Sequence, residues 1–145
     1  MITSKWEFGK GVTDVLRVRR SVGFSEDALD EKSIHLVIYD ENLPCGTGSI
    51  CFTDGAYRIT YLCVLPEMQR QYVGDLMIRL LLVKGFNMMA EVIRVTPLNN
   101  SSAFFEKYGF EKSENGDLEV TPETLVLNSK CGHDCSQCVN KSCKR

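Results

Sequence analysis

The chain has 145 residues, of which 43% are hydrophobic and 25% are charged, and its formal net charge at pH 7 is −2. This composition suits one globular domain, provides no basic surface for nucleic acid, and contains no apolar run near the ~20 residues of a membrane span. The chain has seven cysteines, an odd number, and its first residues do not show the pattern of a signal peptide. We therefore expect a cytoplasmic, reducing location, with thiols that are free or metal-bound.

A helix is predicted after residues 1–10, which we expect to form an edge strand or an extended arm. Thr13 or Asp14 can cap this helix by accepting hydrogen bonds from its first N–H groups. Its arginines, Arg19 among them, belong to a polar side that we expect to be a solvated basic face. Its apolar positions fit one face: Val15, Leu16, Val18 and Val22.

Residues 23–32 carry four acidic side chains and show no strong periodicity. We predict a loop or a short second helix that lies over the rim of a site. An acidic rim could attract a cationic amine, although acid-rich loops are usually just solvated.

A β-meander is predicted next, with strands over residues 34–39, 45–53 and 57–64. The second strand contains Gly46 and Gly48, which suggest a bulge or a close backbone approach. Turn residues separate the strands, and the last strand leads directly into the segment that carries the clearest chemistry.

That segment reads LCVLPEMQRQYVGDLMIRLLL over residues 62–82. An apolar strand ends at Pro66, a polar loop follows, and apolar positions recur at helical spacing from Gly74. Such a loop directs free backbone N–H groups to one place, at the positive end of a helix dipole. The pattern predicts an anion cradle, most naturally one for phosphate.

The remaining elements follow in the same alternation. The helix is expected to end at a C-cap near Gly85, and a strand over residues 91–96 pairs in parallel with the strand before the helix. A short helix over 103–108 comes next. A final antiparallel hairpin over 110–113 and 124–127 turns around Asn115-Gly116.

Two runs resemble motifs of the GNAT N-acetyltransferase superfamily. V-L-P-E-x-Q-x-x-Y-x-G is similar to motif A, with Gln69 at its Q/R position, Gly74 at its last glycine and Tyr72 at its middle glycine. NNSSAFFEKYGF, over residues 99–110, is similar to motif B. We expect Tyr72 to adopt ordinary φ/ψ angles and to widen the loop.

The resemblance covers residues 34–128 and implies an α/β fold with a mixed, splayed sheet and helices on both faces. It divides the chain into an acetyltransferase domain over residues 1–128 and a cysteine-rich tail over 129–145. It implies an acetyl-CoA-dependent N-acetyltransferase that acts by direct attack of a primary amine on the thioester. We expect the amine to belong to a small molecule or a peptide, and the protein to be a monomer or a homodimer. The alternative is a non-catalytic coenzyme A-binding regulatory module whose working part is the tail.

The same resemblance implies a set of cofactor-binding residues in the strand, the loop, the helix start and motif B. They are Leu62, Cys63, Val64, Gln69, Arg70, Gln71, Tyr72, Val73, Gly74, Asp75, Asn99, Asn100 and Phe105.

The sequence does not assign the general acid or the general base. Phe105 occupies the motif position whose tyrosine commonly protonates the leaving thiolate, and Tyr108 follows one helical turn later, either as a substitute acid or as a packing residue. His35 has a suitable pKa for a general base, but a lone strand histidine is more often simply hydrogen-bonded. Glu67 and Tyr61 are further candidates, the latter through a water relay.

The tail holds Cys131, Cys135, Cys138 and Cys143 within thirteen residues. Thiolates bind zinc strongly, and short loops can wrap a tetrahedral ion, so these four cysteines predict a zinc site. The alternative is a tail with free or oxidised thiols.

Overall fold

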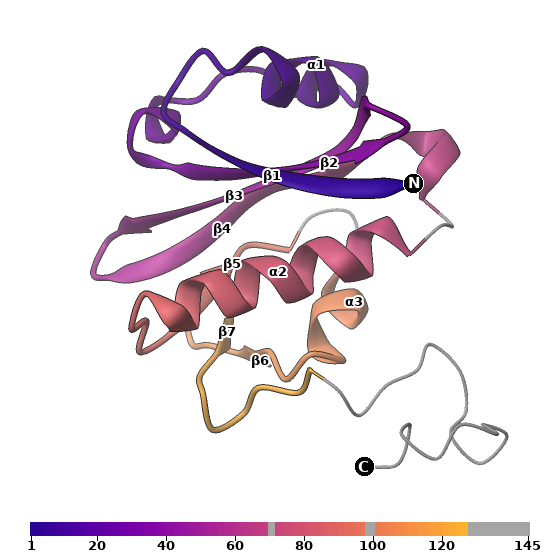
Figure 1. The fold of residues 1–145 in the computed structure, drawn as a ribbon. Coiled ribbons are helices and arrows are strands. Elements are labelled where there is room, and N and C mark those ends of the chain that lie inside the picture. The colour runs from indigo at the N-terminus through magenta and orange to yellow at the C-terminus, as the bar shows by residue number, and fades with distance from the viewer. Residues whose placement is uncertain (70–71, 98–100, 128–145) are drawn as a thin grey trace, which may run out of the picture.

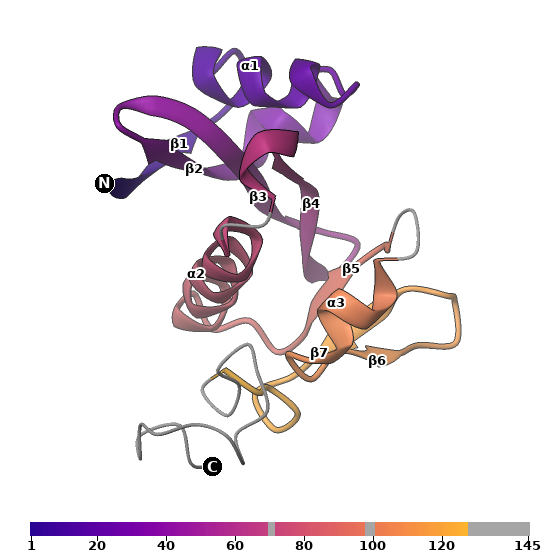
Figure 2. The same cartoon turned by 90° about the vertical axis from the view of Figure 1, so that its right-hand side faces the viewer.

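The computed structural model describes residues 1–69, 72–97 and 101–127, which form a seven-stranded mixed sheet with helices on both faces (Figures 1 and 2). The strands are β1 (Ile2–Phe8), β2 (Ile34–Asp40), β3 (Leu43–Thr53), β4 (Ala56–Val64), β5 (Ile93–Val95), β6 (Glu111–Lys112) and β7 (Leu118–Val120). The helices are α1 (Thr13–Ser21), η1 (Ala28–Lys32), η2 (Pro66–Met68), α2 (Val73–Asn87) and α3 (Ser102–Glu106). The predicted fold class is confirmed.

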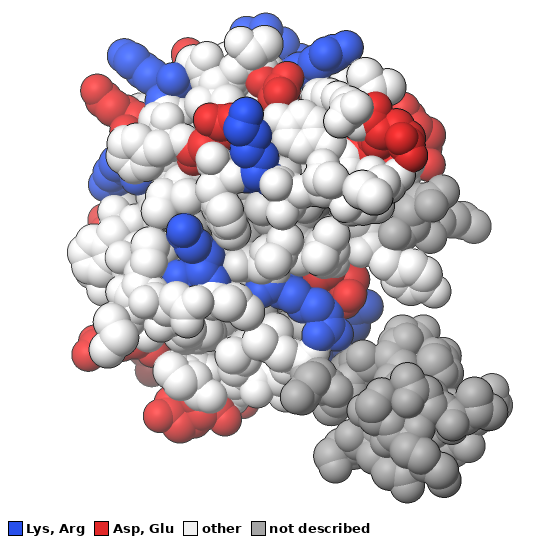
Figure 3. All heavy atoms as spheres, in the orientation of Figure 1, with Lys and Arg blue, Asp and Glu red and all other residues white. Residues whose placement is uncertain are grey.

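The strand order is β1-β2-β3-β4-β5-β7-β6, so β1 is the predicted edge strand. Only β4 and β5 run in parallel in the described sheet, and α2 forms the crossover between them. On the face drawn in Figure 3, basic and acidic side chains are interspersed. Among the described helices, none is long and apolar enough to cross a membrane.

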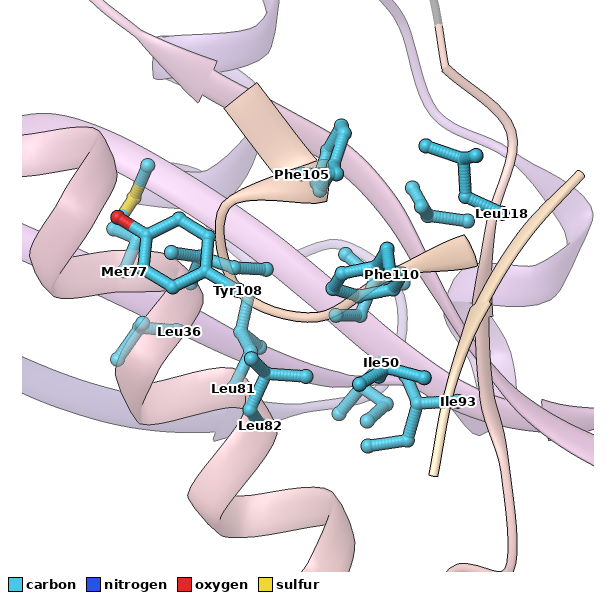
Figure 4. Packing of buried hydrophobic residues seen from close by; sticks show 14 of the residues in the cluster. Leu36, Ile50, Met77, Leu81, Leu82, Ile93, Phe105, Tyr108, Phe110 and Leu118 are labelled. Atoms are coloured by element: carbon cyan, nitrogen blue, oxygen red, sulfur yellow. The ribbon is translucent and has the colours of Figure 1, made fainter. Parts of the chain in front are cut away.

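Helix α2 supplies much of the core through side chains that are fully buried against the sheet (Figure 4). Gly85 lies inside this helix, so the predicted C-cap there is wrong. A Cβ on Gly85 would lie 2.6 Å from Cδ1 of Ile93 and 3.0 Å from Cδ1 of Ile50. The glycine therefore permits close packing on the sheet, and the helix continues to Asn87.

Two other local predictions are wrong. The N-cap of α1 is Val12, without a side-chain hydrogen bond, and Asp14 instead accepts a 2.6 Å hydrogen bond from the hydroxyl of Tyr39. The final hairpin turns at Gly116 as expected, but its second strand is β7 and not residues 124–127. Those residues pass over the end of α3, where the Val126 N–H donates to the Tyr108 carbonyl.

Arg19 does not lie on a solvated face. Its guanidinium is fully buried and donates to both carboxylate oxygens of Asp30, at 2.7 and 2.9 Å. Burial alone would raise the pKa of Asp30, but hydrogen bonds from Arg19 and from the Asp27 N–H, with the charge of Arg19, hold that pKa below its usual value. The pair joins α1 to η1.

We predict that Asp30→Asn lowers the free energy of unfolding by about 3–5 kcal/mol at pH 7, because it leaves the Arg19 charge buried without its partner. The lowered pKa means that the wild-type contribution is present at neutral pH and is lost as the pH falls below about 4. Denaturant unfolding at several pH values measures both effects.

Glu31→Gln is the matched control, since Glu31 is the exposed neighbour in the same helix. A loss equal to that of the control, or a wild-type-to-variant difference that grows on acidification, would contradict this account of the ion pair.

Candidate active site

The site begins where β4 and β5 separate. The two strands pair only at Tyr57–Ile93, Arg58–Arg94 and Ile59–Val95. Beyond Ile59, β4 has no partner on its β5 side in the described sheet. The backbone groups on that side therefore have no strand partner among the described residues and could bind a ligand, apart from the Val64 carbonyl, which accepts a hydrogen bond from the Gln69 side chain.

A β-bulge accompanies the separation. Tyr61 has a left-handed φ of 51°, and the pairing of β4 with β3 shifts register at this position. Gly48 lies opposite the bulge, where a Cβ would come within 2.8 Å of Cδ1 of Leu62 and 2.9 Å of Cδ1 of Leu81. The predicted close approach at Gly48 is therefore confirmed, and the missing Cβ leaves room for the side chains of Leu62 and Leu81.

The separated strands open a cavity of about 660 Å³. On the α2 face its lining includes side chains from β4, the following loop, and the starts of α2 and α3: Leu62, Val64, Gln69, Gly74, Phe104 and Phe105. On the α1 face it is lined by Phe24, Asp27, Arg58 and Tyr61. The cavity thus reaches both faces of the sheet through the gap between β4 and β5.

The α2 end of the cavity has the properties of an anion site. Gly74 lies in the first turn of the 15-residue helix α2, whose first N–H groups lack helical partners and carry the positive end of the dipole. The Gln69 side chain donates a 3.1 Å hydrogen bond to the Val64 carbonyl, which ties the loop to the end of β4. Among the described residues, a Cβ on Gly74 would meet only Phe104 and Val64, at 3.7 Å or more.

Tyr72, at the N-cap of α2, adopts φ 62° and ψ 17°. The expectation of ordinary φ/ψ angles is wrong, because the backbone keeps the left-handed conformation that glycine adopts most easily. The side chain remains 72% exposed, and the turn accommodates it by directing it into solvent.

At the α1 end, the Tyr61 hydroxyl donates to Oδ2 of Asp27, while Oδ1 of Asp27 accepts a 2.7 Å hydrogen bond from the Leu29 N–H. The guanidinium of Arg19 lies 4.5 Å from the centre of the Tyr61 ring, and Phe24 packs edge-on against the same ring at 5.3 Å. The hydrogen bond to Asp27 raises the pKa of Tyr61, so its hydroxyl stays protonated at neutral pH.

Of the predicted cofactor residues, five line the cavity through their own atoms: Leu62, Val64, Gln69, Gly74 and Phe105. Cys63 is buried and does not line the cavity, and burial raises the pKa of its thiol to about 11. The cavity lining does not include Tyr72, Val73 or Asp75. Arg70, Gln71, Asn99 and Asn100 lie outside the described residues.

Tyr108 is 1% exposed, and its hydroxyl donates to the Asp75 carboxylate. Burial and that hydrogen bond raise the pKa of Tyr108 far above its usual value. The side chain does not line the cavity, and it packs edge-on against Phe104.

His35 is also buried and does not line the cavity. Its Nε2 lies 2.8 Å from the Gly9 carbonyl and must carry the proton, so Nδ1 accepts from the Ser49 hydroxyl at 2.6 Å. Ser49 in turn accepts a hydrogen bond from Arg19. Burial lowers the pKa of His35, and the ring is neutral with both nitrogens occupied.

Sequence reasoning missed several residues of the cavity, in particular Asp27 and Phe24 as individual side chains, although it placed residues 23–32 over the rim of a site. It also missed Arg58, which donates to Thr96 Oγ1 and to Asp117 Oδ2, each at 2.8 Å. The described residues contain no group of three or more metal-ligating side chains, and Cys45, Cys51 and Cys63 are free thiols.

Comparison with known proteins agrees with this geometry. Residues 31–112 match the family model of the acetyltransferase (GNAT) domain, which is more than half of the chain. The chain therefore belongs to the GNAT acetyltransferase family, and the resemblance found in its two motifs is confirmed.

Individual relatives are more distant. The chain is 26% identical over 84 residues to the uncharacterized N-acetyltransferase YjcF of Bacillus subtilis (strain 168), a match over 58% of this chain and 60% of that protein's length. Its fold resembles a GNAT family acetyltransferase from Brucella melitensis in complex with acetyl-CoA (TM-score 0.67, 17% identity, 87% and 91% of the two chains). It also resembles the PaiA N-acetyltransferase from Thermoplasma acidophilum in complex with coenzyme A (TM-score 0.63, 13% identity, 83% and 99%).

The left-handed conformation of Tyr72 generates a stability prediction. Tyr72→Gly should raise the free energy of unfolding by about 1 kcal/mol, since glycine removes the steric cost of this conformation and the exposed ring contributes little packing. Tyr72→Ala, which removes the ring but keeps Cβ, should show no such gain. Equal stability of the two variants in denaturant unfolding would contradict the prediction.

Proposed function

We propose that the protein is an acetyl-CoA-dependent N-acetyltransferase that transfers an acetyl group to a primary amine. The observation that carries the proposal is the cavity through the split sheet, with the start of helix α2 at one end and a carboxylate at the other. The pyrophosphate of acetyl-CoA would bind at the start of α2, and the acceptor amine would enter from the α1 face.

In this arrangement the free edge of β4 holds the cofactor arm. The N–H and C=O groups beyond Ile59 that lack a strand partner match the amides of pantetheine, and the N–H groups can polarise the thioester carbonyl as negative charge develops there. The apolar side chains of Leu62, Phe104 and Phe105 exclude water from the same space. Most of the acceleration then comes from aligning the amine with the thioester.

The reaction needs few proton-transfer groups from the protein. The amine nitrogen attacks the carbonyl carbon, the C–S bond breaks, and the attacking ammonium must first lose a proton. Coenzyme A thiolate can leave without a dedicated acid, because thiols are acidic enough. The buried hydrogen bonds of Tyr108 and His35 support packing roles for both, and we propose no proton transfer through either.

The alternative is a non-catalytic coenzyme A-binding module. It is supported by Phe105, which replaces the proton-donating tyrosine of the motif and is 4% exposed. Release of free thiol from acetyl-CoA in the presence of primary amines separates the two, since the module would bind acetyl-CoA without releasing thiol.

We further propose a monomer or homodimer in the cytoplasm that acts on a small-molecule or peptide amine. The cysteine content supports the reducing location.

The phosphate-binding role of the α2 start predicts that Gly74→Glu abolishes acetyl-CoA binding, because its carboxylate would face the pyrophosphate. Gly74→Gln is the matched control, with the same shape and no charge, and should retain more affinity than the Glu variant. Isothermal titration calorimetry with acetyl-CoA measures both. Unchanged affinity in a folded Gly74→Glu variant would show that the phosphate binds elsewhere.

The predicted zinc site at Cys131, Cys135, Cys138 and Cys143 lies outside the described residues and remains a prediction from the sequence. Elemental analysis of protein purified under reducing conditions should find one equivalent of zinc, which is lost in a chain truncated after Lys130. Metal-free full-length protein, or metal retained after truncation, would end the hypothesis.

A further inference from the structure

The α1 end of the cavity carries an unbalanced negative charge. Among the described residues that line the cavity, only Asp27 and Arg58 are ionisable to a full charge at pH 7. Arg58 forms an ion pair with Asp117, whereas no described basic side chain forms one with Asp27. The nearby Arg19 is already neutralised by its bidentate contact with Asp30.

Asp27 retains capacity for a ligand. Its carboxylate accepts one hydrogen bond from the Leu29 N–H and one from the Tyr61 hydroxyl. A carboxylate has about four acceptor sites, so lone pairs remain for further donors. Half-buried at the cavity wall, it presents them where solvent competes less than at the surface.

The surroundings of Asp27 are apolar and aromatic. Phe24 and Tyr61 form an edge-on pair beside the carboxylate, and both line the cavity. A carboxylate next to aromatic rings binds an ammonium group on an apolar body, through charge-assisted hydrogen bonds and ring contacts.

Neighbouring residues hold the Asp27 carboxylate and the Tyr61 ring in position. The Asp27 N–H donates to Asp30 at 3.0 Å, which forms a capping box at η1, and Arg19 supports the Tyr61 ring at 4.5 Å. Asp27 and Tyr61 are therefore held by buried groups and do not need to be ordered by a ligand.

We propose that Asp27 and Tyr61 form the acceptor subsite, and that it selects primary ammonium groups without a neighbouring carboxylate. This inference rests on the proposed acetyltransferase function and adds the chemical class of the acceptor. A carboxylate beside the amine, as in an α-amino acid, would be repelled by Asp27, while the amine that remains after its removal would bind.

The test uses calorimetry on the full chain saturated with coenzyme A, so that acceptor binding is measured without turnover. Phenethylamine and phenylalanine are the probes, since they differ only in the carboxylate. The wild-type protein should bind phenethylamine at least tenfold more tightly than phenylalanine.

Asp27→Asn should weaken phenethylamine binding roughly 10–100-fold, the range for losing a hydrogen bond to a charged group, and should narrow the preference over phenylalanine. Asparagine also caps helices, so the variant keeps the N-cap of η1. Glu31→Gln, which removes an exposed charge of the same helix, should leave both affinities unchanged.

The outcomes distinguish the two levels of the proposal. If coenzyme A binds but Asp27→Asn keeps wild-type affinity for phenethylamine, or if phenylalanine binds as tightly, the subsite is wrong, and the acetyltransferase proposal is left to the thiol-release test. If coenzyme A itself does not bind, the proposed function is wrong and the subsite falls with it.

Discussion

The separation of β4 from β5 is the constraint on which the site depends. Three residue pairs hold the strands together, and the bulge at Tyr61 then turns β4 away. The bulge is possible because Gly48 has no Cβ and leaves room for the side chain of Leu62 to pack against its backbone. The same distortion opens the cavity, frees a strand edge for backbone contacts with a ligand, and directs Tyr61 toward the face opposite α2. A regular pairing of β4 with β5 would close the cavity, occupy the free strand edge and change the direction of Tyr61.

A buried polar network supports the bulged strand on the α1 face. It runs from the Gly9 carbonyl through His35 and Ser49 to Arg19 and Asp30. Both terminal nitrogens of Arg19 have acceptors, which allows the charge pair to lie in the interior, while its Nε is buried without a partner among the described residues. Because Arg19 also contacts the Tyr61 ring, the network joins the core to the cavity wall. This explains why a strand histidine with a suitable intrinsic pKa is neutral and has no free nitrogen.

The sequence predicted the order and type of most elements because strand, loop and helix patterns are local. It also located the loop and helix start that line the cavity, since Gln69 and Gly74 belong to a contiguous motif. It could not show that Arg19 pairs with Asp30, because helix periodicity does not reveal which polar side chain finds a buried partner. The contact between Asp27 and Tyr61 joins positions 34 residues apart and depends on the bulge. Gly85 was misread because a packing glycine and a capping glycine look alike in sequence.

A crystal structure with bound acetyl-CoA would test the central claim most directly, that the gap between β4 and β5 is the acetyl-transfer site. The account predicts the pyrophosphate at the first turn of α2, the pantetheine arm along the β4 edge beyond Ile59, and the acetyl group within the gap, on the path to Asp27. A cofactor bound on the outer surface of either sheet face, with the gap between the strands left unfilled, would contradict it.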